Sequence, residues 1–325
     1  MIDSRGILSW AFALLLSSLL VTSLAGAGDT PSRNGFDLSD SRVPVDQILR
    51  GTARDGARAV DAPRFVDLEA AARWVAPENA VLGLVLAGEA RAYPEHLLDY
   101  HQVVNDRVGE HAVVVIWDPI AGIPLAFERE VDGRMLDFGV SGLVYRGHCL
   151  LYDRQTESLW LPIEGRAVAG PLAGAKWRRV RIVKRALASW AETHPETKIL
   201  ERPLLKQIDY RFSPFSAYWS SPRIPFPVGD VDPRFHPKEI VLGVSCGGDE
   251  RAFLSSLVTA AGGRVVDEVG GVRLRVAYDP ASATFFHDAG DQCTVIEAYW
   301  FAWQAFRPGV RVWQQAEVLE GLPLR

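Results

Sequence analysis

The chain repeats part of its own sequence, and this repeat limits the folds that it can adopt. The run VLGLVLAGEARAY, which begins at Val81, returns at Val241 as VLGVSCGGDERAF, a displacement of 160 (241 minus 81). Trp190 returns as Trp303, where the displacement is 113 (303 minus 190). The second copy is therefore shorter by about 47 residues (160 minus 113). Two copies of one incomplete unit are expected to pack together about a pseudo-twofold axis.

The residues that the second copy lacks are roughly 133–179, and they hold the densest group of polar side chains. Residues 138–145 and 150–152 read as two strands, joined by a turn at Arg146-Gly147-His148. Beyond the second strand, Arg154 is flanked by Asp153 and Glu157. A guanidinium fork beside carboxylates suits either a structural lock or the binding of an anion. We favour the lock, because charged clusters in turns more often hold the turn.

Short Val-rich runs separated by Gly and Pro predict an α+β fold that is mainly β, built from two β-rich repeats packed together. The first repeat carries a hairpin-containing insertion. The predicted segments are a first repeat at 43–200 with its insertion at about 133–179, a Pro- and aromatic-rich connector at 201–237, and a shorter repeat at 238–325. Helices are predicted at 67–75, 95–100, 186–192 and 253–261. The connector is expected to be irregular, pinned by its aromatic rings, and suited to line a groove for a sugar or an aromatic ligand.

The first residues resemble a secretory signal. Arg5 precedes an apolar run, and small residues follow it up to position 27. This pattern predicts a signal peptide at 1–27, and we favour its cleavage over an uncleaved membrane anchor. Residues 28–42 are polar and predict a flexible leader. The protein is thus expected to be exported to the periplasm or the cell exterior, with membrane contact only through this N-terminal segment.

The charge of the chain limits the classes of partner that it can bind. The chain has 35 Lys and Arg against 40 Asp and Glu and no basic stripe, which argues against nucleic acid as a partner and leaves a small molecule or a protein.

Three cysteines allow at most one internal disulfide, and Cys246 with Cys293 is the candidate pair because both lie in the later half of the chain. Free buried cysteines are common, and we favour them over this pair.

Two further residues are candidates for chemistry. His101 precedes a strand and suits a metal ligand, a base or a structural histidine. Asp118 precedes Pro119, and the same dipeptide recurs as Asp279-Pro280, which favours a role in turn formation. The sequence contains no zinc spacing, phosphate loop, nucleophile elbow or dinucleotide fingerprint.

Five motifs together resemble a known family. They are GEARAYP at 88–94, HQVVND at 101–106, GVSGL at 139–143, YDRQTESLW at 152–160 and AGPLAG at 169–174. This combination is similar to the DUF3179 family of exported bacterial proteins, and the resemblance runs from about Val43 to Trp313. The family is one of unknown function, so the resemblance implies export and a shared fold but no reaction.

The chain departs from the family pattern at two places. Members usually carry a Cys-Pro motif after the apolar strand, whereas this chain has Asp118-Pro119 followed by Ile120-Ala121. The hairpin turn has Arg146 and His148 where the family tends to have Asn or Asp. A thiolate pair could bind a soft metal or carry out redox chemistry, but Asp118 offers only hard oxygen ligands. Thiol-dependent activity of relatives is therefore not expected here.

Two hypotheses follow, and the sequence leaves open whether the protein is an enzyme. We favour a non-catalytic binding or scaffold protein. The alternative is a metal-dependent or acid/base enzyme in which His101, Asp118, Asp153 and Glu157 converge. The candidate ligand-binding residues are His101, Asp118, Tyr152, Asp153, Arg154 and Glu157. No cofactor is predicted, although a metal ion stays open, with His101 and Asp118 as candidate ligands.

Overall fold

The computed structural model describes residues 31–203 and 208–314. The signal peptide predicted at 1–27 lies outside the described residues. Among the residues described, no helix is long and apolar enough to cross a membrane.

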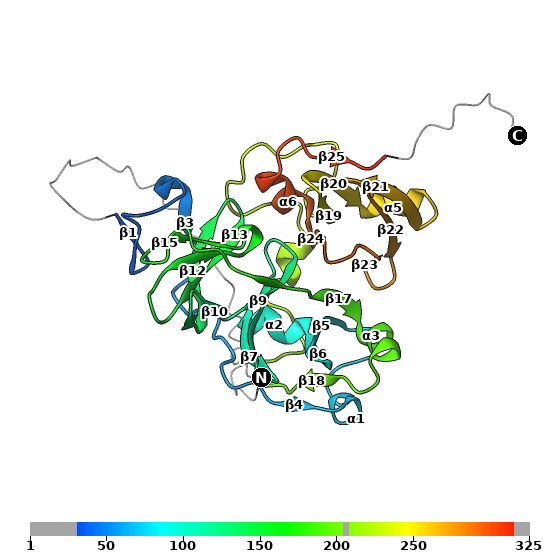
Figure 1. Cartoon of the computed structure of the whole chain (residues 1–325), viewed down its shortest axis with the longest axis horizontal. Helices are drawn as coiled ribbons and strands as arrows, with labels where there is room; N and C mark the ends of the chain where they lie inside the picture. The colour runs from blue at the N-terminus through cyan, green and yellow to red at the C-terminus, as the bar shows by residue number, and fades with distance from the viewer. Residues whose placement is uncertain (1–30, 204–207, 315–325) are drawn as a thin grey trace, which may run out of the picture. The chain divides into compact units, whose positions relative to one another are not determined.

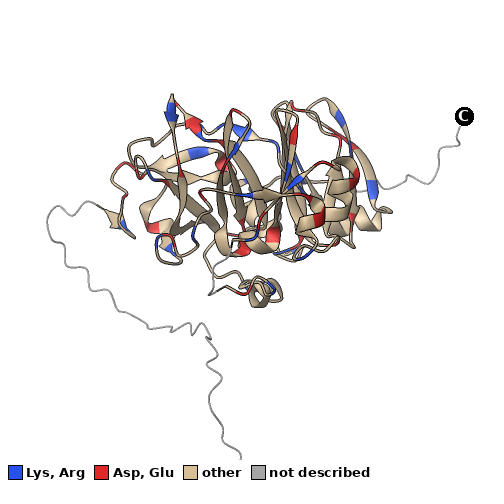
Figure 2. Cartoon of the chain, turned by 90° about the horizontal axis from the view of Figure 1, so that it is seen from below, with Lys and Arg blue, Asp and Glu red and all other residues tan. Residues whose placement is uncertain are grey.

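The predicted mainly β fold is confirmed, since 42% of the structure is strand and 15% is helix. Five sheets of three or more strands are arranged as a ring that resembles a five-bladed β-propeller (Figure 1). We call them sheets I to V in the order in which their main strands occur along the chain. Figure 2 shows that Lys and Arg residues are interspersed with Asp and Glu residues along these elements.

Sheets I and II come from the first copy. Sheet I has the strand order β17-β5-β6-β18-β4, and sheet II has the order β16-β9-β8-β7. Their strands are β4 Phe65–Val66, β5 Ala80–Leu86, β6 Glu89–Pro94, β7 Val103–Val108, β8 His111–Asp118, β9 Ile123–Glu128, β16 Arg179–Val180, β17 Val183–Ala186 and β18 Lys198–Leu200.

Sheet III comes largely from the insertion and has the order β15-β14-β13-β12-β3. Sheets IV (β24-β19-β20-β25) and V (β21-β22-β23) come from the second copy. The strands of sheet III are β3 Ile48–Arg50, β12 Phe138–Tyr145, β13 His148–Asp153, β14 Leu159–Leu161 and β15 Arg166–Ala169. Those of sheets IV and V are β19 Ile240–Cys246, β20 Asp249–Leu254, β21 Arg264–Val269, β22 Val272–Asp279, β23 Thr284–His287, β24 Cys293–Tyr299 and β25 Arg311–Val312.

Short elements complete the chain. Two-stranded ribbons are formed by β1 Ser32–Arg33 with β2 Phe36–Asp37 and by β10 Glu130–Val131 with β11 Arg134–Met135. The 3-10 turns are η1 Val45–Gln47 and η2 Pro162–Glu164. The helices are α1 Leu68–Ala71, α2 Glu95–His101, α3 Leu187–Thr193, α4 Ser216–Trp219, α5 Ser255–Ala260 and α6 Trp300–Phe306.

Strand pairing follows the internal repeat. In sheet I, Gly83 lies opposite Val183 on one side and Ala92 on the other. In sheet IV, Gly243 lies opposite Ile296 and Ala252, which are the same positions displaced by 113 (296 minus 183) and 160 (252 minus 92). Sheet I therefore corresponds to sheet IV and sheet II to sheet V, while sheet III has no counterpart in the part of the chain that the structure describes. The fold is two pairs of related sheets with one added sheet.

A glycine–tryptophan contact recurs in both copies. A Cβ atom at Gly83 would lie 2.5 Å from the indole ring of Trp190, and a Cβ atom at Gly243 would meet Trp303 in the same way. Neither glycine is in a left-handed conformation, so the close approach of the indole is the reason for glycine. Each helix that carries the Trp, α3 or α6, is thus seated directly on its sheet.

A buried ion pair joins the two copies. Lys184 and Glu297 occupy equivalent positions, opposite Leu82 and Leu242 respectively. The Lys184 Nζ atom lies 2.9 Å from a Glu297 carboxylate oxygen and 3.9 Å from one of Glu95. Beside them, the carboxylate of Asp99 accepts a hydrogen bond from Trp117 Nε1 at 2.9 Å. A lysine from one repeat and the equivalent glutamate from the other therefore neutralise each other in the interior.

Some predictions need correction. The leader predicted as flexible at 28–42 contains the β1–β2 ribbon from Ser32 onward, and Phe36 and Leu38 are buried in the core at 1% exposure each. The helix predicted at 67–75 ends at Ala71, where the chain turns and brings Val75 into the core. The first two residues predicted for the helix at 253–261 belong to β20.

Other features agree with expectation. Residues 138–145 and 148–153 form the predicted hairpin, with Arg146 and Gly147 as its two-residue turn and His148 already in the second strand. Cys246 and Cys293, the candidate pair, form a disulfide across β19 and β24, which corrects the expectation of free cysteines. In the connector, Tyr218 and Trp219 donate hydrogen bonds to the carbonyl oxygens of Ile120 and Pro119. The segment boundaries predicted from the sequence stay predictions.

Replacing either of the glycines that contact a tryptophan, Gly83 or Gly243, by alanine should destabilise the fold. We expect Gly83→Ala and Gly243→Ala each to lower the free energy of unfolding by about 1–3 kcal/mol, the usual cost of overpacking a core. Urea unfolding followed by tryptophan fluorescence measures both, and each variant is the matched control for the other. A loss in only one of them would contradict the equivalence of the two copies.

Burial of Asp99 should make stability depend on pH. Desolvation, with help from the nearby Glu95, raises the pKa of Asp99 from 3.8 to about 7. The folded state therefore binds a proton that the unfolded state releases. The resulting stability is full below pH 3.8 and is lost as the pH rises to about 7, by at most about 4 kcal/mol.

The variant Asp99→Asn tests this, since its amide oxygen can still accept from Trp117. We expect it to be more stable than the native chain at pH 8 and to have a flatter stability profile between pH 5 and pH 8. Urea titrations at several pH values give both curves. Parallel curves for the two proteins would show that Asp99 does not carry the effect.

Candidate functional site

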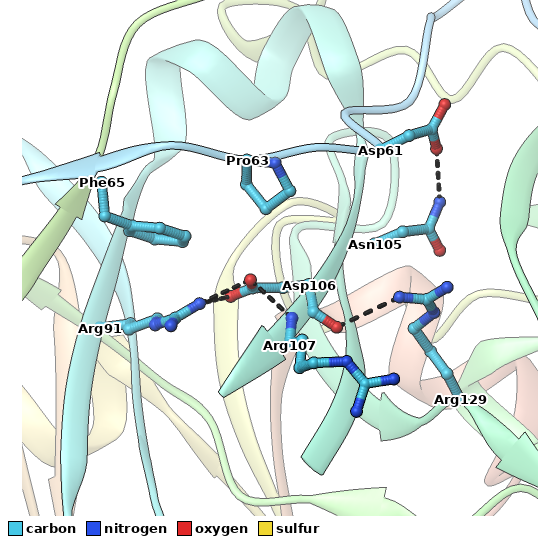
Figure 3. Close-up of a pocket in the computed structure, with 8 residues that line it drawn as sticks. All are labelled: Asp61, Pro63, Phe65, Arg91, Asn105, Asp106, Arg107 and Arg129. Carbon is cyan, nitrogen blue, oxygen red and sulfur yellow. Dashed lines mark hydrogen bonds and ion pairs between the residues drawn. The ribbon is translucent and has the colours of Figure 1, made fainter. Parts of the chain in front are cut away.

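A pocket of about 430 Å³ lies where sheets I and II meet the segment that leads into β4 (Figure 3). Arg91 comes from β6, and Asn105, Asp106 and Arg107 come from β7. Arg129 follows β9 directly. The residues that line the pocket are Asp61, Pro63, Phe65, Arg91, Asn105, Asp106, Arg107 and Arg129.

Asp106 is the anchor of this pocket. Its side chain is 3% exposed, and its two oxygens accept from Arg91 Nη1 at 2.5 and 2.6 Å. They also accept from the hydroxyl of Tyr93 at 2.6 Å and from the backbone N–H of Arg107 at 2.7 Å. Burial, followed by the charge of Asp106, raises the pKa of Tyr93 well above its ordinary value. The phenol therefore stays protonated and acts as the donor in its hydrogen bond to Asp106. The carboxylate is saturated with donors.

Arg91 is held on three sides. Its Nε atom donates to Glu89 at 2.8 Å, its Nη1 atom donates to Asp106, and its guanidinium carbon lies 4.2 Å from the centre of the Phe65 ring. Burial alone would lower the pKa of Arg91, but the hydrogen bonds to Asp106 and Glu89 outweigh it and raise the pKa. The side chain is therefore a fixed positive charge with one orientation.

Asn105 connects the pocket to sheet III. Its Nδ2 atom donates to Asp61 at 2.8 Å and to the carbonyl of Phe138 at 2.8 Å, and its Oδ1 atom accepts from the N–H of Phe138 at 2.9 Å. Asp61 also forms an ion pair with Arg154, 2.9 Å between Nη1 and Oδ2. The predicted lock of Arg154 with Asp153 and Glu157 is thus wrong: Arg154 binds a carboxylate from a distant segment.

Arg129 closes the opposite side of the pocket, across Asp106 from Arg91 (Figure 3). It donates to the backbone carbonyls of Asp106 at 3.2 Å and Leu136 at 2.9 Å and forms an ion pair with Asp137. Asp137 in turn accepts from the side chain of Gln155 at 2.8 Å. The arginine is consequently positioned by both the strand end and the insertion.

The second copy offers an internal comparison. Arg251 and Asp267 occupy the positions of Arg91 and Asp106 and form an ion pair at 3.4 Å. The surrounding residues differ, because Tyr93, Asn105 and Arg107 are replaced by Phe253, Val266 and Glu268. The ion pair is therefore part of the repeated scaffold. The additional polar groups are specific to the first copy, which makes them the candidates for function.

The four residues of the metal or acid/base hypothesis have separate partners. His101 bonds through Nδ1 to the carbonyl of Arg58 and through Nε2 to the hydroxyl of Tyr210, both at 2.7 Å, and burial lowers its pKa. Asp118 accepts from Ile120 N–H at 3.0 Å, as Asp279 does from Ala281 N–H, which agrees with turn formation.

The remaining candidates lie around the insertion. The buried carboxylate of Asp153 accepts from Trp160 Nε1 at 2.9 Å, and Glu157 pairs with Arg54 at 2.8 Å. The hydroxyl of Tyr152 donates to Asp55 at 2.6 Å. Within residues 31–203 and 208–314, no group of three or more His, Cys, Asp or Glu residues is placed to hold a metal ion.

Sequence reasoning did not select the residues that line the pocket. Arg91 lies in GEARAYP, and Asn105 and Asp106 lie in HQVVND, so they were present in the motifs without being recognised as a site. The recurrence of Arg91 and Asp106 as Arg251 and Asp267 was the available signal. Asp61 and Arg129 lie outside the motifs, and only the fold brings them to the pocket.

Comparison with known proteins adds the family. Neither the curated proteins nor the solved structures gave a match. The family model described as "Protein of unknown function (DUF3179)" matches residues 54–292, which is 239 (292 minus 54, plus 1) of 325 residues. This range includes the pocket, the insertion and most of the second copy. The chain therefore belongs to the DUF3179 family.

Proposed function

We propose that this protein is an exported binding protein that holds a small anionic molecule in the pocket around Asp106. One observation carries the proposal: three arginines, Arg91, Arg107 and Arg129, line a single pocket of about 430 Å³. The carboxylates of Asp61 and Asp106 oppose them, which leaves a net lining charge of +1 (three minus two). A pocket of this volume suits a small molecule.

The arginines are arranged in advance of binding. Arg91 and Arg129 are each already fixed by hydrogen bonds within the protein, so little side-chain freedom is lost when a ligand binds. Guanidinium groups bind carboxylate and phosphate oxygens through paired hydrogen bonds. Phe65 and Pro63 offer an apolar wall beside these charges, which favours an anion that carries a carbon skeleton.

Binding without chemical conversion is favoured by the state of the carboxylate. Asp106 already accepts hydrogen bonds from Arg91, Tyr93 and Arg107. Its carboxylate oxygens are therefore occupied by contacts within the protein and are not directed toward a ligand proton. Export is supported by the disulfide of Cys246 and Cys293, a bond typical of oxidising compartments.

Isothermal titration calorimetry with inorganic phosphate, sulfate and succinate tests the proposal. We expect at least one of these anions to bind, with an affinity that falls as salt is raised. Arg107→Gln should weaken binding about tenfold, since a hydrogen bond to a charged group is lost. Arg107 is exposed, so this variant should keep the fold.

The second copy supplies a matched control. Arg91→Gln and Arg251→Gln remove the same scaffold ion pair, one inside the pocket and one in the other copy. Only Arg91→Gln should reduce anion binding, while both should reduce stability. The proposal fails if the native protein binds none of the three anions, or if Arg251→Gln weakens binding as much as Arg91→Gln.

A further inference from the structure

A second cavity, of about 420 Å³, lies between sheet I with helix α3 and strand β23 of sheet V. Val85, Trp190 and Phe286 give it apolar walls, and Arg181, Arg185 and Ser189 give it polar groups. It is formed where β17 meets β23. The related contact in the other half of the molecule is that of β24 with β9.

The equivalent surface in the second copy is covered by other residues of the chain. The equivalents of Val183, Arg185 and Ser189 are Ile296, Ala298 and Ala302, and all three belong to the core that contains sheet III. The hairpin of the insertion reaches them, because His148 Nε2 lies 2.9 Å from the carbonyl oxygen of Ala302. The inserted sheet thus covers in one copy a surface that is left as a cavity in the other.

At this surface the first copy differs from the second in charge as well as in polarity. Arg181 and Arg185 stand where the second copy has Thr294 and Ala298. An exposed surface needs polar residues but not two charges of one sign. Among the described residues, no Asp or Glu lines this cavity. Its lining therefore contains two arginines and no carboxylate.

The contacts of the two arginines are consistent with this excess charge. Arg185 donates to the backbone carbonyls of Lys184, at 2.6 Å, and of Phe285, and its guanidinium carbon lies 4.2 Å from the Phe286 ring centre. Arg181 lies 3.8 Å from the carboxylate of Asp291, whose side chain is 98% exposed. A pair with so exposed a partner is weak, so the charge of Arg181 is available to a ligand.

We propose that this cavity is a second binding site, for a small aromatic carboxylate. The carboxylate binds to Arg181 and Arg185, with Ser189 able to donate a further hydrogen bond. The flat apolar body lies between Val85, Trp190 and Phe286. This site is independent of the pocket around Asp106, since the two share no lining residue.

Fluorine NMR of 4-fluorobenzoate with the mature protein tests the site. We expect the probe to bind, and neutral 4-fluorobenzyl alcohol to bind at least about tenfold more weakly because it lacks the charge. Arg181→Gln should weaken 4-fluorobenzoate binding by a similar factor. Arg181 has a side chain 56% exposed, so its replacement should leave the fold intact.

A second variant and two controls keep the result interpretable. Val85→Trp adds bulk at a wall that is 47% exposed and should block the cavity without removing a charge. Arg211→Gln removes an exposed charge from the connector and should leave binding unchanged. Arg107→Gln should also leave it unchanged, because that residue lines the other pocket.

Three outcomes would overturn the proposal. The first is equal affinity for the acid and the alcohol. The second is unchanged binding in both Arg181→Gln and Val85→Trp. The third is loss of 4-fluorobenzoate binding in Arg107→Gln with retention in Arg181→Gln, which would assign the probe to the pocket around Asp106.

Discussion

The contact of Lys184 with Glu297 is the interaction on which the arrangement of the two copies depends. Each residue lies at the equivalent position of its own repeat, so the pair forms across the place where the copies meet. Two lysines or two glutamates there would repel each other in a medium of low polarity. The copies have therefore diverged at this position into complementary charges. Breaking such a pair by removing one partner is costly, because the other charge stays buried.

Repetition also separates what is structural from what is specific. The Gly83–Trp190 and Gly243–Trp303 contacts and the Arg91–Asp106 and Arg251–Asp267 ion pairs occur twice, so they belong to the scaffold. Tyr93, Asn105 and Arg107 occur once, around the same ion pair. A functional pocket can thus be built by adding polar residues to an inherited pair, with the scaffold interaction positioning the new groups.

Much of the fold could be predicted from sequence, because its signals are local or repeated. The displacement of 160 and then 113 is matched by strand register, and the Arg146-Gly147 turn is local. Arg154 shows the limit of such reasoning. Its neighbours in sequence are acidic, yet its partner Asp61 lies 93 residues away (154 minus 61), which no local pattern reveals. Likewise, Phe36 and Leu38 are isolated apolar residues in a polar stretch, and only the fold buries them.

The insertion also sets how far apart along the chain the strands of sheet I lie. Gly83 pairs with Val183, a separation of 100 (183 minus 83), whereas Gly243 pairs with Ile296, a separation of 53 (296 minus 243). Closing the longer loop costs only about 0.6 kcal/mol more in chain entropy, so stability is barely affected. Folding rate is more sensitive, because contacts distant in sequence form slowly. Strand β5 must wait for its neighbour β17 until the whole of sheet III has been synthesised, and during that time its edge is open to other chains.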